Sequence, residues 1–141
     1  MNREAIYGAL FVKLQGITGL NTVSRRLKHY DDVPAAEQPA LFMTATSQHG
    51  SQTKGLPSLY YLDSKVWIYV HETDKSIAPA TGLNNILDKI DAVLKPSIPG
   101  NKQTLGGLVD HCWVDGEIVT DEGSLGDQAV AILTIKMQTT T

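Results

Sequence analysis

Three strand-like segments follow one another along the chain with no helix between them, and this order restricts the fold more than any other feature. The segments are Thr22–His29, Ala40–Thr46 and Leu59–His71. A parallel pair of strands needs a crossover connection of a dozen or more residues, usually a helix, whereas antiparallel neighbours need only a short turn. The sequence therefore predicts a mostly antiparallel sheet.

Two further kinds of segment complete the predicted fold. Apolar residues recur every four positions in Arg3–Gln15 and at spacings of three and four in Ser76–Lys95, which is typical of helices with one buried face. Leu108–Thr120 and Gln128–Met137 resemble strands joined through a turn at Asp121–Gly126. We expect an α+β fold, a sheet of about five strands covered by two helices in the order α-β-β-β-α-β-β.

The chain is expected to form one domain over residues 1–141, a usual size for a single hydrophobic core. Within it, Ser47–Pro57 is rich in small polar residues and lacks apolar periodicity, so we predict a long flexible loop. Loops of this length between strands are uncommon unless they have a function. Its candidate contact residues are His49, Gln52 and Lys54.

The strand-like segment Leu59–His71 is longer than a small core needs, so it is expected to project beyond the core or to bend near Asp63.

Opposite charges gather in two separate parts of the chain. The formal net charge is only −3, which gives little support to nonspecific binding of nucleic acid. The basic candidates are Arg25, Arg26 and Lys28, and the acidic candidates are Asp115, Glu117, Asp121 and Glu122. Two arrangements remain open: the patches join different copies of the chain head to tail, or they neighbour each other within one sheet.

The sequence contains no recognisable catalytic constellation. Cys112 is the only cysteine, which is typical of a chain that folds in a reducing compartment, here the cytoplasm. On a strand, His111 points to the opposite face and cannot activate the Cys112 thiol, so we predict that Cys112 is a small buried hydrophobe. The spacings of histidine and glycine match no metal, phosphate or dinucleotide site. We expect no enzymatic activity, no cofactor, no metal and no membrane span.

Three segments carry a resemblance to a known family: Val23–Met43, the VWIYV strand at Val66–Val70, and Gln103–Met137. They are similar to the tail terminator (minor tail) proteins of long-tailed bacteriophages. The resemblance implies a hexameric ring in the neck region of the virion, assembled in the host cytoplasm. Such a ring caps the tail tube, stops its polymerisation and joins the tail to the head connector, without a cofactor or an active site.

The resemblance also implies that DNA passes through the lumen of the ring without specific binding. Basic residues lining the lumen would retain the duplex, so we expect an acidic or neutral lumen to which the four acidic candidates contribute, unless they lie on the outer rim.

One alternative is another neck or head–tail connector protein. An alternative of a different class is a small cytosolic ligand-binding domain or enzyme with the polar loop as a lid, which a pocket lined by His71, His111 or Cys112 would favour.

Overall fold

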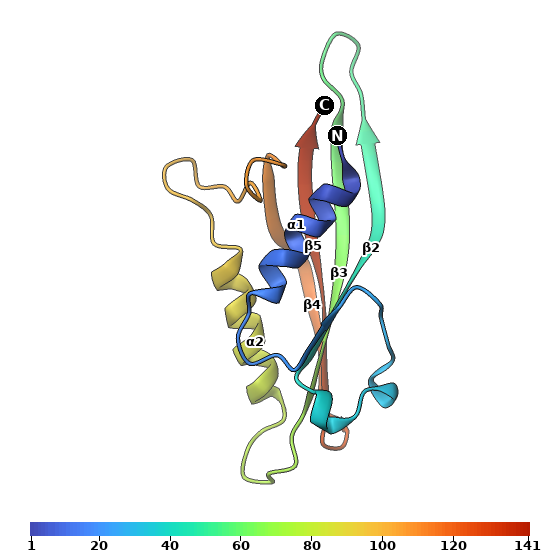
Figure 1. Cartoon of the computed structure of the whole chain (residues 1–141), viewed down its shortest axis with the longest axis vertical. Coiled ribbons are helices and arrows are strands. Elements are labelled where there is room, and N and C mark those ends of the chain that lie inside the picture. The colour runs from blue at the N-terminus through green and yellow to red at the C-terminus, as the bar shows by residue number, and fades with distance from the viewer.

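The computed structural model describes all 141 residues and confirms the α+β fold with two helices and a five-stranded sheet. The strands lie in the order β1-β2-β3-β5-β4, and every neighbouring pair is antiparallel except β1 with β2. Both helices cover the same face of the sheet, and both chain termini lie at one end of it (Figure 1). The elements are α1 (Arg3–Gln15), β1 (Thr22–Ser24), η1 (Tyr30–Asp32), η2 (Ala35–Glu37), β2 (Ala40–Ser51), β3 (Leu59–His71), α2 (Ala80–Val93), β4 (His111–Leu125) and β5 (Gln128–Thr140).

The first predicted strand is much shorter than expected. Only Thr22–Ser24 pairs with β2, in parallel, and from Arg25 the chain leaves the edge of the sheet. The Tyr69 hydroxyl donates a hydrogen bond of 2.7 Å to the Lys28 carbonyl, which holds the departing chain over the face that the helices leave open. The alternation of residues 25–29 therefore does not reflect a strand, because this segment is held by Tyr69 and not by a sheet ladder.

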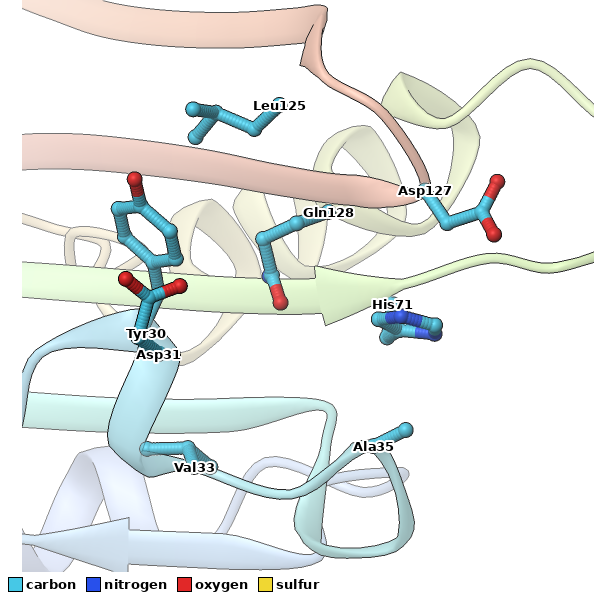
Figure 2. Close-up of a pocket in the computed structure, with 8 residues that line it drawn as sticks. All are labelled: Tyr30, Asp31, Val33, Ala35, His71, Leu125, Asp127 and Gln128. Atoms are coloured by element: carbon cyan, nitrogen blue, oxygen red, sulfur yellow. The ribbon is translucent and has the colours of Figure 1, made fainter.

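The segment between β1 and β2 closes one end of the open face. Figure 2 shows Tyr30 of this segment beside β3 and β5, in a hollow that Val33 also lines. A small cluster is buried here, consisting of Val33, Ala40, Phe42 and Tyr69. The amide side chains of Gln38 and Gln128 donate to each other at 2.9 Å, so these buried polar groups are satisfied. The rest of the open face is free of any covering element.

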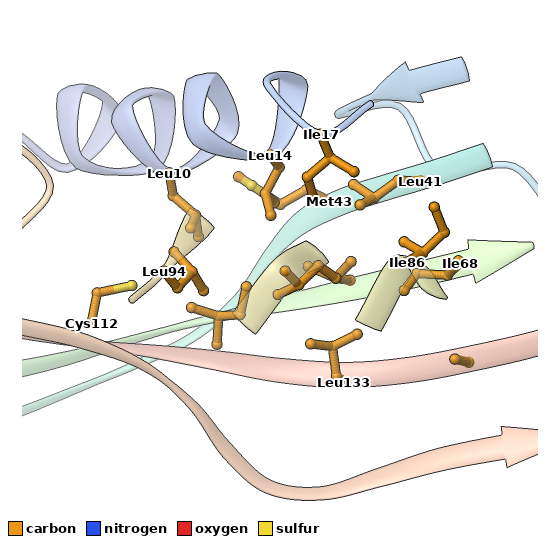
Figure 3. Close-up of a cluster of buried hydrophobic side chains, with 14 of the residues drawn as sticks. Leu10, Leu14, Ile17, Leu41, Met43, Ile68, Ile86, Leu94, Cys112 and Leu133 are labelled. Carbon is orange, nitrogen blue, oxygen red and sulfur yellow. The ribbon is translucent and has the colours of Figure 1, made fainter. Parts of the chain in front are cut away.

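The main core lies between the helices and the sheet and contains 23 buried residues (Figure 3). The first helix occupies Arg3–Gln15 as predicted, and the Asn2 side chain caps it by accepting from the Ala5 amide at 3.0 Å. The second predicted helix is confirmed over Ala80–Val93, so the preceding Ser76–Ala78 is not helical. Pro79 occupies the N-cap position, which needs no backbone N–H.

The first five residues of the polar segment predicted to be a loop are strand. Ser47–Ser51 continues β2 and pairs with β3, where His49 lies opposite Tyr61, so the connection is reduced to residues 52–58. Small polar residues hide this strand because it is exposed and packs no apolar side chain. β3 itself runs unbroken over its predicted range, and the bulge lies across from it in β2, between Ala45 and Ser47.

The hairpin of β4 and β5 is confirmed, but its turn lies later than predicted. Asp121–Leu125 still belongs to β4, and the chain reverses at Gly126 and Asp127. β4 has two register shifts, one between Asp115 and Val119 and one between Asp121 and Leu125. Gly116 and Gly123 supply the positive φ angles, 71° and 91°, within these shifts. The turn-forming residues of the sequence thus build bulges in an edge strand.

Candidate functional site

The strand that leads into the basic candidates and the strand that carries the acidic candidates lie at opposite edges of the sheet. β1, which leads directly into the basic segment, lies at one edge, and β4 lies at the other. One row of paired residues runs across the whole sheet at this level, namely Ser24, Phe42, Trp67, Ile132 and Val119. β1 and β4 are therefore not neighbouring strands, but the basic segment crosses the open face toward β4. The Lys28 carbonyl accepts a hydrogen bond from Tyr69 of β3, and Tyr30 lines a groove with Val119 of β4.

The basic segment has two cations without an ion-pair partner in the chain. Arg25 forms an ion pair with Glu4 of α1, which fixes it against the first helix. Arg26 and Lys28 are exposed and form no ion pair. Of the three basic candidates, Arg26 and Lys28 are thus free to contact another molecule.

Of the four acidic candidates on β4, two have a polar partner within the chain and two have no ion-pair partner. The Asp115 carboxylate lies 3.7 Å from Nζ of Lys136 and accepts a hydrogen bond from Nε1 of Trp113. Asp121 accepts a hydrogen bond from the Ser124 hydroxyl. Glu117 and Glu122 are exposed and form no ion pair within the chain. These two acids lie in the two bulged parts of β4.

The three polar candidates gather at the end of the β2–β3 hairpin. His49 lies on β2, and Gln52 and Lys54 lie in the connection that projects beyond the rest of the sheet (Figure 1). All three are exposed. They form a separate site at the end of the molecule where the chain termini lie.

A hollow of about 480 Å³ includes His71, a residue whose pocket would favour the ligand-binding alternative. Asp127 lies 2.6 Å from Nζ of Lys75, whose hydrogen bond is the largest cause that lowers the pKa of the Asp127 carboxyl, and His71 contributes less. Figure 2 shows the Asp127 side chain pointing away from the cluster. The connection 52–58 lies at the opposite end of β3, roughly 40 Å away at the usual rise per residue, so it cannot close over His71.

A second hollow, of about 330 Å³, is lined in part by His111 and Cys112. Cys112 is only 1% exposed and belongs to the main core, which confirms its prediction as a buried hydrophobe. Burial raises the pKa of its thiol to about 12. His111 instead stacks on Trp113 with ring centroids 5.0 Å apart and accepts a hydrogen bond from the Gln103 amide. The two side chains do not form a nucleophile and base.

We expect Cys112 to resist thiol reagents in the folded protein. At pH 8, a pKa of about 12 in place of 9.0 lowers the thiolate fraction about a thousandfold, and burial adds steric protection. The rate of reaction with a coloured disulfide reagent measures this directly. A Leu27→Cys variant, whose side chain replaces one that is 43% exposed, is the control and should react rapidly. Equal rates for both thiols would contradict the burial of Cys112.

The structure contains an ion-pair cluster around Lys136 on the open face that the sequence did not predict. Nζ of Lys136 lies 3.4 Å from Asp63 and 5.6 Å from the centre of the Tyr61 ring, in addition to its contact with Asp115. The alternation within β3 and within β5 indicates which residues of each strand share a face. It does not indicate that Asp63 lies opposite Lys136, because neither segment alone shows which strands pair.

The structure contains no group of three or more side chains of the types that commonly hold a metal ion. None of its helices combines the length and the apolar character that a membrane span requires.

Neither the protein-family models nor the curated proteins compared with this chain gave a match. Among solved structures, the chain is similar to one described as "Virion of native gene transfer agent (GTA) particle". The TM-score is 0.56 at 6% sequence identity, and the match covers 95% of this chain and 93% of the other. At this identity the similarity establishes a shared fold over nearly the whole length of both chains.

Proposed function

We propose that this chain is a structural component of a phage-like virion, and specifically a tail terminator. Its copies form a hexameric ring that caps the tail tube, stops its polymerisation and joins the tail to the head connector. The observation that carries the proposal is the presence of unpaired cations on the segment after β1 and of unpaired carboxylates on the edge strand β4. A head-to-tail ring needs two different complementary patches on each copy, which this arrangement supplies.

The similarity to a chain of a gene transfer agent virion supports the same proposal, because it extends over 95% of the chain. That similar chain belongs to a virion particle and is not assigned to a position in it, so another neck or head–tail connector protein is the alternative. The role requires no cofactor and no enzymatic activity. The protein is then part of the virion neck, assembled in the host cytoplasm.

The proposed contacts fall on different parts of the molecule. Arg26 and Lys28 of one copy face Glu117 and Glu122 of the next, and Arg25 and Asp115 flank these contacts. The hairpin tip, which carries His49, Gln52 and Lys54, contacts the tail tube or the connector. The lumen carries no cluster of basic side chains, so that the duplex passes without specific binding.

We expect the chain to assemble into a species with the mass of a hexamer. Six copies of the 15.3 kDa chain amount to about 92 kDa, and this species should form alone or on addition of tail-tube subunits. Sedimentation or native mass spectrometry measures the mass, and electron microscopy measures the length of tubes polymerised with and without the chain. Capped tubes should be shorter. A chain that stays at 15.3 kDa with tube subunits present, and leaves tube length unchanged, contradicts the proposal.

A further inference from the structure

Exposed apolar side chains accompany both the basic segment and the acidic strand β4. Leu27, which is 43% exposed, stands between the unpaired Arg26 and Lys28. On β4, Val119 is 54% exposed and its neighbour Ile118 is 38% exposed, within the acidic part of that strand. Exposed apolar side chains are common singly, but here each one is framed by charges opposite to those around the other.

The patch on β4 continues into a groove on the open face, which we call the β4 groove. It has a volume of about 330 Å³. It is lined by Tyr30, Val119, Asp121, Leu125, Val130 and Ile132. Five of these six residues are hydrophobic, and the carboxylate of Asp121 is the one charged group on the lining. Such a groove suits an aliphatic side chain that arrives with a cation beside it.

The outer edge of β4 is unsuited to accept another strand. It has no partner on that side, but its two register shifts interrupt the regular ladder of backbone groups that an added strand would need. A molecule that binds at this edge therefore binds through side chains. The groove beside the bulges is the feature that offers side-chain contacts.

We propose that Leu27 of one copy of this chain inserts into the β4 groove of the next copy. Arg26 and Lys28 then lie beside the acids of β4, where Glu117 and Glu122 have no partner within their own chain. This inference rests on the proposed ring and names the residues that hold it together. Leu27 is exposed outside the β4 groove of its own chain, so Leu27 and the groove are two different surface features. A contact that joins them from copy to copy is heterologous.

Disulfide cross-linking tests the contact. A Leu27→Cys and Val119→Cys double variant, made in a Cys112→Ala background, should give a ladder of covalent oligomers on a denaturing gel after mild oxidation. The matched control pairs Val119→Cys with Val12→Cys on α1, since Val12 is 65% exposed but lies on the helix-covered side. The control should give no ladder. Assembly of both variants without a ladder from the first pair overturns the inference.

A second variant separates this inference from the proposed ring. Leu27→Asp removes the apolar side chain and adds a repelling charge, so the dissociation constant of the oligomer should rise about tenfold to a hundredfold. Leu27→Met keeps an apolar side chain and should assemble like the unmodified chain. Circular dichroism checks that both variants are folded. If the unmodified chain assembles and Leu27→Asp assembles equally well, the contact is wrong and the ring stands. If the unmodified chain does not assemble even with tube subunits, the proposed function itself fails.

Discussion

Replacing Gly82 with alanine should destabilise the protein by about 1 to 3 kcal/mol, because the added methyl group overpacks the core where α2 meets β3. A Cβ atom at this position would lie 2.5 Å from Cγ1 of Val70, closer than two carbon atoms can approach. Val70 is 6% exposed and β-branched, so it has little freedom to rotate away. Chemical denaturation measures the expected loss in the free energy of unfolding.

Gly8→Ala is the matched control for this prediction. Gly8 lies inside α1, and a Cβ there meets nothing within 4 Å, so alanine should leave stability unchanged or raise it by up to about 1 kcal/mol. In a Val70→Ala background, Gly82→Ala should cost much less, since the clashing methyl group is gone. Equal effects of Gly8→Ala and Gly82→Ala would show that α2 does not approach β3 as closely as described.

Elements with a buried stripe could be predicted from the sequence with good accuracy. α1 and β3 have the predicted bounds, because each alternates between buried and exposed residues at the period of its own backbone. The hairpin of β4 and β5 was also predicted, although its turn was placed too early. Burial of one face makes apolar residues recur at the period of the helix or strand. This periodicity was sufficient to predict the fold class.

Segments without that burial could not be predicted. Ser47–Ser51 is strand because it pairs with β3, and nothing in its own side chains indicates a partner. Conversely, residues 25–29 alternate but are held over the open face by Tyr69, which lies about forty positions further along the chain. In both cases the conformation is decided by a long-range contact and not by local preference.

The candidate site could be predicted only as a set of charges. The sequence identified both the basic and the acidic segment, but it did not show that the basic segment crosses the open face toward β4. It also could not separate Arg25, which is neutralised by Glu4, from Arg26, which is not. The apolar groove beside β4 combines residues from three parts of the chain, so no single segment of the sequence contains it.

Reversing Arg26 to glutamate should weaken assembly of the proposed ring by about tenfold or more at low salt. Arg26 is exposed and without an ion-pair partner in its own chain, so its free charge is available to a neighbouring copy. A single exposed pair contributes only about 0 to 1 kcal/mol, but reversal replaces an attraction with a repulsion at every contact of the ring. The dissociation constant from sedimentation measures the effect, and added salt should weaken the unmodified ring in the same direction.

A second reversal across the contact should restore part of the lost affinity. Glu117 is the partner to change, because Glu117→Lys removes a carboxylate that has no ion-pair partner within the chain, whereas changing Asp115 would also disturb Lys136. Lys95→Glu is the control, since it alters the net charge equally from an exposed position just after α2. If Lys95→Glu weakens assembly as much as Arg26→Glu, the effect is one of net charge alone. If neither salt nor Arg26→Glu changes the dissociation constant, the opposite charges of the basic segment and of β4 do not hold the copies together.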